Sequence, residues 1–451
     1  MFSNHSYIHS WFVAKSMQEV FLNDNQFSIW IEIEIALAQA EELCGVIPKD
    51  SATNIEKKLK NFQLDLEQLK MEYGKIGFPI LPFINQLTNA CDDETARWVH
   101  FGATTQDIID TGLVLQSREG LFLLEQDISR VINALVTLAR QHRDSVMAGR
   151  TFQQLAAPIT FGYKAAIWLD EILRHQERLD AMKPRLLVGQ CAGAVGTFAT
   201  LGDQGLAVQK EMMTILGLGT PDITWHTARD RWAELISWMA MLTATLAKIA
   251  TEIAILMRSE IGEVSESYRP GQGASTTMPQ KRNPIHCQPV IAIAHKLREL
   301  AGSQLTAMIQ EHERGVGQMH LEWLVIPEAF ILTAGALEHM VALLDNLQVF
   351  PDSMLANMNL DGGLMMSEAV MMALASKLGK HQAHKLISSI AGRAKDDGVT
   401  LKEALLSDDE VMQHLDESQL DSLLDPSSYT GMAGDMVDAV LALARDKGYA
   451  V

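Results

Sequence analysis

Two stretches of this sequence carry apolar residues in the alternating four-and-three spacing of a helix that packs along one face. The first runs from Leu124 to Leu138, with apolar residues at positions 124, 128, 131, 135 and 138. The second runs from Leu235 to Leu256 and keeps the spacing longer, at 235, 239, 242, 246, 249, 253 and 256. Such a heptad pattern is typical of long helices that pack against one another. The pattern therefore predicts an all-α protein built around a bundle of long helices.

The second stretch is apolar on nearly all sides, because Lys248 and Glu252 are almost its only interior charges. A membrane span, which needs about 20 apolar residues, is the competing interpretation. The polar residues Ser237, Thr243 and Thr245 inside the stretch argue against a span. A helix of this kind is otherwise buried in a large bundle. Because such burial often uses partner subunits, we expect a homo-oligomer and no membrane.

The other helical patterns suggest three helical domains. Residues 26–44 form a helical pattern that stops at Gly45, and residues 51–73 contain two further helices. Long helices are also expected over residues 285–309 and, with a kink at Pro327, over residues 322–347. No strand-rich block is visible. We expect an N-terminal helical domain at residues 1–105, a central long-helix bundle at 106–345 and a C-terminal helical domain at 346–451.

Composition and charge narrow the class of protein. The chain is 47% hydrophobic and only 6% aromatic, which favours helix over strand. Its formal charge is −19 and it has no cluster of Lys and Arg, which excludes a nucleic-acid partner. An anionic small substrate would need a local cationic pocket. The four cysteines are scattered and form no CxxC, and the N-terminus has no signal-peptide pattern. These features predict a cytoplasmic protein.

The segment GQGASTTMPQKRNP at residues 271–284 is the strongest candidate for a functional loop. It is rich in Gly, Ser and Thr and lies between two helical patterns, where rigid helices can hold catalytic groups in place. An ordinary Gly/Ser connector is the alternative, although a connector has no need of Lys and Asn beside a Met-Pro turn. The residues that distinguish the loop are Ser275, Thr276, Met278, Lys281 and Asn283.

Polar residues elsewhere suggest contacts for a carboxylate. Thr104, Thr105 and Gln106 open a predicted helix, where hydroxyls and free backbone N–H groups bind carboxylates well. Simple N-capping is the alternative for these residues. Arg229 can pair with a substrate carboxylate or can tie helices together, and the sequence leaves both interpretations open.

Three histidines near these segments raise the question of a metal. His226, His312 and His320 lie at unequal, loop-like spacing, which gives no ligand signature. We therefore expect no metal.

Several of these segments resemble one enzyme superfamily. The loop at 271–284 is similar to the signature loop of the fumarase/aspartase superfamily, G-S-S-x-x-M-P-x-K-x-N, and departs from it at Ala274 and Thr276. Four further segments resemble its adenylosuccinate lyase branch: GATTQD at 102–107, GRTFQQ at 149–154, WHTARDR at 225–231 and EHER at 311–314. The resemblance covers essentially the whole chain.

The resemblance implies roles for particular residues. Ser275 would be the catalytic base that moves a proton alpha to a carboxylate, and Lys281 and Asn283 would stabilise the resulting aci-carboxylate dianion. A serine alkoxide needs backbone N–H groups and a nearby cation. The implied substrate contacts are Thr104, Thr105, Gln106, Thr151, Gln154, Thr276, Met278, His226, Arg229 and Arg314. The resemblance also implies no cofactor and a homotetramer with a twenty-helix core, in which three chains build each site.

The sequence departs from the superfamily where many relatives carry a general acid. Phe152 occupies the place of the acid histidine, and Gln288 occupies the place of its supporting glutamate. A leaving group that is a stable anion does not need such an acid; a carboxylate, for example, has a pKa of about 4. The missing pair therefore favours expulsion of a stable anion, such as the carboxylate released when a lactone opens.

The details narrow the reaction further. WHTxRDR, PQKRNP, QEHER and LDPSSYTG resemble segments of the bacterial 3-carboxy-cis,cis-muconate cycloisomerases, which implies lactonisation of an anionic di- or tricarboxylate. The alternative is a β-elimination lyase that releases fumarate or a related unsaturated acid from a substituted succinate. An inactive, crystallin-like structural protein is a third reading, against which the intact Ser275, Lys281 and Asn283 argue.

Overall fold

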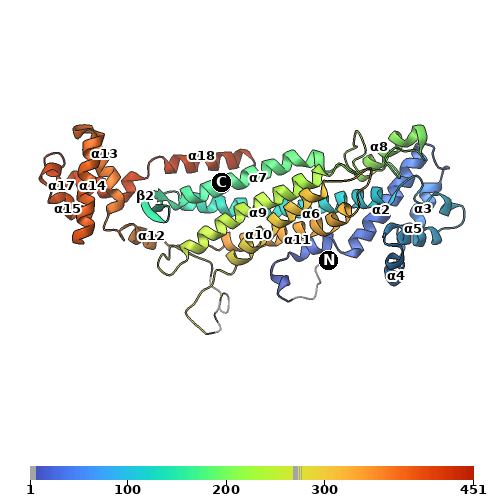
Figure 1. Cartoon of the computed structure of the whole chain (residues 1–451), viewed down its shortest axis with the longest axis horizontal. Helices are drawn as coiled ribbons and strands as arrows, with labels where there is room; N and C mark the ends of the chain where they lie inside the picture. Colours follow the sequence, from blue (N-terminus) through green and yellow to red (C-terminus); the bar gives the residue numbers. More distant parts are fainter. Residues whose placement is uncertain (1–6, 268–272, 274, 276, 451) are drawn as a thin grey trace. The chain divides into compact units, whose positions relative to one another are not determined.

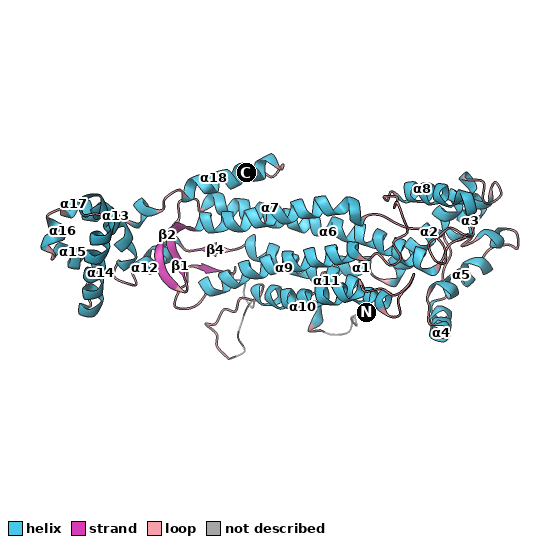
Figure 2. Ribbon diagram, turned by 45° about the horizontal axis from the view of Figure 1, so that its top comes forward, coloured by secondary structure: helices cyan, strands magenta, loops and turns pink. Residues whose placement is uncertain are grey.

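The computed structural model describes residues 7–267, 273, 275 and 277–450 of the chain. Helices dominate these residues and the strands are few and short (Figures 1 and 2). The all-α prediction is therefore confirmed. The α-helices are α1 Lys15–Val20, α2 Asn23–Leu43, α3 Ser51–Leu59, α4 Leu66–Ile76, α5 Ile80–Asn89, α6 Thr105–Gln141, α7 Phe161–Leu186, α8 Gly205–Leu216, α9 Asp230–Leu256, α10 Cys287–Ala307, α11 Gln318–Leu344, α12 Pro351–Met358, α13 Ser367–Leu378, α14 Lys380–Asp397, α15 Leu401–Leu406, α16 Asp409–Met412, α17 Glu417–Leu424 and α18 Ala433–Asp446. The strands are β1 Val146–Thr151, β2 Gln154–Thr160, β3 Val264–Ser265 and β4 Gln348–Val349.

The long helices follow the heptad pattern of the sequence. The predicted seam at 124–138 lies on α6 and the seam at 235–256 lies on α9, and every apolar position of both seams is buried. The helices expected over 285–309 and 322–347 are α10 and α11, and Pro327 lies inside α11. The apolar stripe that a heptad produces is therefore the stripe that packs.

Two of the described helices, α9 and α11, are long and apolar enough to cross a membrane. Half of the apolar window of α9 and 61% of that of α11 are buried inside the chain. This pattern is typical of core helices in a large helical protein. It agrees with the bundle interpretation of the α9 segment.

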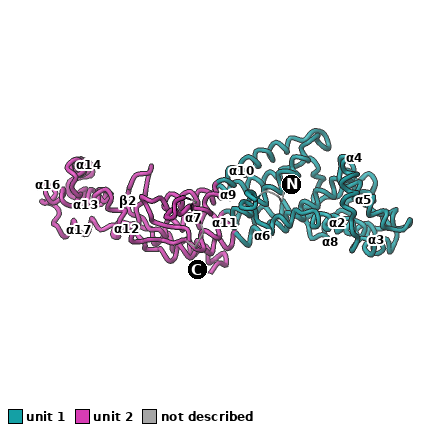
Figure 3. Tube along the Cα trace, turned by 90° about the horizontal axis from the view of Figure 1, so that it is seen from below, with its two compact units in different colours: residues 1–127, 175–244, 292–338 teal, residues 128–174, 245–291, 339–451 magenta. Residues whose placement is uncertain are grey.

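The chain divides into two compact units, each assembled from three segments (Figure 3). Unit 1 comprises residues 1–127, 175–244 and 292–338, and unit 2 comprises residues 128–174, 245–291 and 339–451. The divisions fall inside α6, α7, α9, α10 and α11, so each of these helices contributes residues to both units. The division into domains at 1–105, 106–345 and 346–451 stays a prediction.

Unit 1 contains the N-terminal helices and their core. Helix α2 ends at Leu43, and Gly45 follows with a φ of 71°, as the stop signal predicts. The two helices expected over 51–73 are α3 and α4. Trp30 of α2 packs edge-on against Phe83 of α5 with ring centroids 5.5 Å apart, and both side chains are buried. Helix α2 also packs on α3 and α8, which closes this core.

Unit 2 contains a β-hairpin that the sequence did not predict. Strands β1 and β2 pair antiparallel, with Thr151 opposite Gln154 at the closed end. The two turn residues, Phe152 and Gln153, have φ values of 50° and 66°. Positive φ at both turn positions is the two-residue type I′ turn, which normally carries Asn and Gly. The usual sequence signal was absent, so the strands were missed.

The remainder of unit 2 supports this hairpin and forms a small helical core. Arg150 of β1 forms a bidentate ion pair with Glu263, whose carboxylate also accepts a hydrogen bond from Asn357. Glu263 directly precedes β3, which pairs with β4. Further along the chain, α13, α14, α15 and α17 pack around buried aliphatic side chains that include Val370, Leu374, Ile387 and Leu401.

Candidate active site

The loop that contains Ser275 runs between β3 and α10 in unit 2. Hydrogen bonds connect its described residues across the loop. The carbonyl of Gly273 accepts one from the backbone N–H of Asn283 at 3.2 Å and one from Asn283 Nδ2 at 3.1 Å. The backbone N–H of Lys281 donates to the carbonyl of Met278 at 3.1 Å. Gly273 has a φ of 66°, which glycine adopts without strain. These bonds fold the described part of the loop back on itself.

The hydroxyl of Ser275 faces two backbone donors. Its Oγ accepts hydrogen bonds from the N–H of Met278 at 3.1 Å and from the N–H of Thr277 at 3.3 Å. Two such donors stabilise a negatively charged alkoxide oxygen more strongly than they stabilise a neutral hydroxyl. The arrangement is therefore suited to a serine that must act as an alkoxide base.

Of the other predicted residues of the loop, the structure describes all but one. Lys281 and Met278 are exposed, and Lys281 has no carboxylate partner within the part of the chain that the structure describes. Asn283 uses its Nδ2 to hold Gly273 in place. Thr276 lies outside the described residues. Lys281 is thus a cation that a substrate carboxylate can approach.

The closed end of the β1–β2 hairpin carries Thr151 and Gln154 as a cross-strand pair, also in unit 2. Between them, Phe152 is 99% exposed. A non-glycine residue with positive φ is strained by about 1–3 kcal/mol, and full exposure of an aromatic ring adds no packing to offset that strain. Within the described chain, Phe152 therefore contributes nothing visible to stability.

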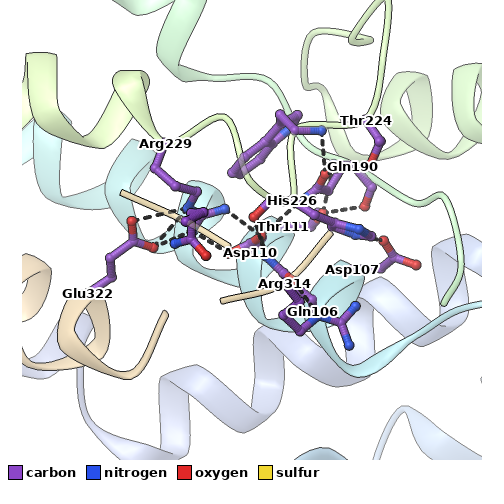
Figure 4. A network of polar contacts seen from close by, with 12 residues as sticks. Gln106, Asp107, Asp110, Thr111, Gln190, Thr224, His226, Arg229, Arg314 and Glu322 are labelled. Carbon is purple, nitrogen blue, oxygen red and sulfur yellow. Dashed lines mark hydrogen bonds and ion pairs between the residues drawn. The ribbon is translucent and has the colours of Figure 1, made fainter. Parts of the chain in front are cut away.

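A second group of predicted residues meets in unit 1, at the start of α6 (Figure 4). Asp107 caps this start by accepting a hydrogen bond from the backbone N–H of Thr104 at 3.0 Å. The same carboxylate accepts bonds from the backbone N–H groups of Ala192 at 3.1 Å and Gly193 at 2.9 Å. Thr104 and Thr105 are half-buried at this helix end. The helix end, with its two hydroxyl residues, has the composition of a carboxylate-binding site.

Arg314 lies beside this helix end because Gln106 holds it. Gln106 is buried; its Oε1 accepts a hydrogen bond from Arg314 Nε at 2.7 Å, while its Nε2 donates to Asp110 and to the carbonyl of His226. Arg314 also donates to the carbonyl of Ala194. It forms no ion pair with a carboxylate among the described residues. Its charge is therefore available to an anionic ligand, whereas Gln106 uses its amide to position it.

Unlike Arg314, Arg229 is buried and paired with carboxylates of the chain itself. It is 2% exposed and forms ion pairs with two buried carboxylates, those of Asp110 and Glu322 (Figure 4). Nη1 and Nη2 lie 2.8 and 2.9 Å from the two oxygens of Asp110, and Nε lies 3.1 Å from Glu322 Oε1. Burial alone would lower the pKa of Arg229, but the two carboxylate charges raise it above the ordinary value. In this structure Arg229 ties α6, α9 and α11 together, the second of the two roles that the sequence left open.

His226 is buried against Asp107, with Nε2 2.9 Å from Asp107 Oδ1. Its Nδ1 is buried without a hydrogen-bond partner in the described chain. His312 and His320 are exposed, and the His320 ring packs against Trp323 with centroids 4.6 Å apart. Among the described residues, no three His, Cys, Asp or Glu side chains converge as metal ligands.

The predicted residues thus fall into two groups, each organised within its own unit. Unit 1 brings together Gln106, His226, Arg229 and Arg314 around the start of α6, whereas unit 2 holds Ser275, Lys281 and Asn283 on the loop before α10. Sequence reasoning missed the buried partners Asp110 and Gln190, and it assigned no role to Glu322, which stands in a segment that resembles the E-W element of the adenylosuccinate lyase branch. Gln190, for example, donates to Asp110 at 2.6 Å across 80 positions of sequence. A polar residue inside an apolar helical face, such as Asp110 or Glu322, was the one available signal.

Comparison with known proteins identifies the class. Residues 12–298 match the family described as Lyase, and residues 363–440 match the family described as Adenylosuccinate lyase C-terminus. The chain belongs to this lyase family, within the fumarase/aspartase superfamily, and it is an enzyme of the lyase or cycloisomerase kind. The superfamily resemblance drawn from the signature loop is therefore confirmed.

Particular relatives resemble the chain over almost its full length. The 3-carboxy-cis,cis-muconate cycloisomerase of Acinetobacter baylyi is 40% identical over 441 residues, 97% of this chain and 98% of the relative. The N-acetyl-S-(2-succino)cysteine lyase of Dickeya dadantii is 36% identical over 437 residues, 97% of this chain and 96% of the relative. The crystal structure of a fumarate lyase from Mesorhizobium sp. BNC1 superimposes with a TM-score of 0.91 at 43% identity, covering 96% of this chain and 98% of that one.

Proposed function

We propose that this protein is a 3-carboxy-cis,cis-muconate cycloisomerase, in which Ser275 transfers a proton alpha to a carboxylate through an aci-carboxylate intermediate. The observation that carries the proposal is the pairing of two features. Ser275 Oγ faces two backbone N–H donors, and the place of the usual acid histidine is taken by the exposed Phe152. A site with a base but without that acid suits a reaction in which the nucleophile or leaving group is a carboxylate, because a carboxylate attacks or leaves without a proton.

The remaining residues have distinct tasks in this proposal. Lactonisation joins one substrate carboxylate to a double-bond carbon, and the adjacent carbon, alpha to a second carboxylate, takes a proton from Ser275. Lys281 would balance the dianion that forms before protonation. Arg314 and the hydroxyls of Thr104 and Thr105 would hold a further carboxylate, since Arg314 has no acidic partner among the described residues and lies next to a helix N-terminus. None of these steps calls for a cofactor.

We further infer that each active site is completed by several chains of a homotetramer. The candidate residues are organised in two groups, one in each unit, and neither group alone holds both the base and the unpaired Arg314. A site shared by three chains, as the superfamily resemblance implies, would join the two kinds of group. Light scattering that found a stable, active monomer would contradict this inference.

A cytoplasmic location belongs to the proposal too, because the four cysteines are free. Cell fractionation tests this location.

A β-elimination lyase acting on a substituted succinate is the second candidate. The same absence of the acid histidine favours it when the leaving group is a thiolate, since a thiol has a pKa of about 8.5 and can leave as an anion far more readily than an alkoxide. The similarity to an N-acetyl-S-(2-succino)cysteine lyase supports this candidate. Amine or alcohol leaving groups fit the site less well, because they need a proton.

Incubation with the two substrates separates these candidates. We expect the purified protein to convert 3-carboxy-cis,cis-muconate to its lactone, with a kcat/KM at least about a hundredfold above that for N-acetyl-S-(2-succino)cysteine. Loss of the muconate absorbance and product identification by mass spectrometry measure the first reaction, and release of a thiol measures the second. Thiol release without lactone formation would favour the lyase, and conversion of neither substrate would contradict both proposals.

The pH dependence tests the absence of a histidine acid. In the lactone-forming direction Ser275 donates the proton, so we expect activity to persist between about pH 6 and 8, with no falling limb where a histidine acid would lose its proton. The double substitution Phe152→His with Gln288→Glu restores the relay residues at two exposed positions. It should not raise turnover of the native substrate, because no step needs the added proton.

The competing view is that another histidine has become the acid. His312→Ala and His320→Ala remove exposed rings, and His226→Gln keeps a polar side chain beside Asp107. Each variant is followed as a pH–rate profile, with a circular dichroism melt as the control for folding. A falling limb in the parent enzyme that disappears with one of these substitutions would overturn the no-acid account.

A further inference from the structure

Glu266 occupies a particular place relative to the loop of Ser275. It directly follows β3 and is 6% exposed, so its carboxylate is largely removed from water. Oε1 accepts hydrogen bonds from the backbone N–H groups of His286 and Cys287, both at 3.1 Å, and Oε2 lies 3.2 Å from the N–H of His286. One carboxylate thus joins the residue after β3 to His286 and to Cys287, the first residue of α10.

These bonds are favourable for two physical reasons. The first N–H groups of an α-helix have no partner within the helix, and a carboxylate satisfies them while complementing the positive end of the helix dipole. Burial and the charge of Glu266 raise the pKa of the Cys287 thiol, which keeps the thiol protonated beside the carboxylate. Glu266 therefore fixes the point at which the chain leaves the loop and enters α10.

A short series of hydrogen bonds connects the start of α10 to Ser275. Asn283 lies three residues before His286 and donates twice to Gly273, which in turn lies two residues before Ser275. The donors to Ser275 Oγ, at Thr277 and Met278, lie inside the segment that these contacts enclose. A shift at the start of α10 would therefore pass through Asn283 and Gly273 to the serine and its donors.

We propose that Glu266 is a positioning residue for Ser275: by clamping both ends of the loop it holds the hydroxyl against its two backbone donors. The proposal rests on the role of Ser275 as the base in the proposed function. It assigns no contact with substrate to Glu266. Its consequence is that loss of the carboxylate slows the proton transfer while leaving substrate binding largely intact.

Kinetics of Glu266→Gln test the consequence. The amide keeps the size of the side chain but removes the charge and one acceptor oxygen. We expect kcat to fall about 10- to 100-fold, since a misplacement of about 1 Å can cost a factor of 10², while KM changes less than about threefold. Glu263→Gln is the matched control, because Glu263 is also buried and lies three residues earlier but binds Arg150 and Asn357. It should lower thermal stability without a selective loss of kcat.

A second measurement does not need the substrate. In Ser275→Cys the sulfur takes the place of Oγ, and the two N–H donors should lower the pKa of its thiol, so alkylation by iodoacetamide at neutral pH should be fast. Adding Glu266→Gln should slow alkylation at position 275 at least about threefold, whereas adding Glu263→Gln should not; peptide mass spectrometry separates position 275 from the native cysteines.

The two measurements distinguish the possible failures. An unchanged alkylation rate, or a Glu266→Gln variant with the parent kcat, would overturn the positioning role. Slower alkylation together with a loss of kcat at nearly constant KM would support it. If the parent protein converts neither candidate substrate, the proposed function fails, and the alkylation rates alone then decide whether Glu266 positions residue 275.

Discussion

Replacing Ser275 with alanine is expected to lower turnover by a factor of about 10³ or more while leaving the fold intact. The hydroxyl is the proposed base, and removing a group that carries the proton in the transition state costs its full catalytic contribution. The side chain is only half-buried, and its described hydrogen bonds are those it accepts from Thr277 and Met278. Steady-state kinetics and a thermal melt measure the two effects separately.

Ser303→Ala is the control for this experiment. Ser303 lies on α10, and its hydroxyl donates only to the carbonyl of Glu299 in the preceding turn. The substitution removes the same atom from the same protein, so turnover should stay within about twofold of the parent, as for an ordinary surface change. Near-normal turnover in Ser275→Ala would refute the assignment of the base.

Replacing Arg229 with alanine is expected to lower the free energy of unfolding by about 3–5 kcal/mol, because it leaves the carboxylates of Asp110 and Glu322 buried without a cation. Both carboxylates are 1% exposed. Burial already raises the pKa of Glu322 despite the opposing charge of Arg229, so loss of the arginine should favour a protonated, weakened contact. Urea unfolding followed by circular dichroism measures the change.

Arg185→Ala provides the comparison. Arg185 pairs with Glu234, but both side chains are largely exposed, and an exposed pair contributes about 0–1 kcal/mol. If Arg229 served mainly to bind substrate, Arg229→Ala would instead raise KM with stability close to that of Arg185→Ala. That outcome would reverse the structural role that the ion pairs indicate.

The long helices could be predicted because their signal is local and repeated. The seam at 235–256 repeats the same spacing along the whole of α9, and all its apolar positions are buried. The β1–β2 hairpin could not be predicted in this way, because its turn is Phe152-Gln153 rather than a sequence with glycine. The pairing of β1 with β2 closes that turn in a conformation that its residues do not favour on their own.

The candidate site was predictable only in part for a similar reason. Ser275, Lys281 and Asn283 belong to one continuous motif, so a single segment identified them. The role of Arg229 depends on Asp110 and Glu322, which are 119 and 93 positions away in the sequence. Glu266 caps α10 from 20 positions before it, across the loop. Such pairings are set by packing of distant segments, which residue spacing along one chain does not reveal.

The proton transfer itself can be followed in deuterium oxide. If Ser275 delivers a solvent-exchangeable proton to the carbon alpha to a carboxylate, then lactone formed from 3-carboxy-cis,cis-muconate in this solvent carries one non-exchangeable deuterium on that carbon. Nuclear magnetic resonance and mass spectrometry of the product locate and count the label. We predict one deuterium per turnover with the parent enzyme and at least about a thousandfold slower labelling with Ser275→Ala. Lactone without deuterium at that carbon, or labelling at the parent rate in Ser275→Ala, would contradict the account.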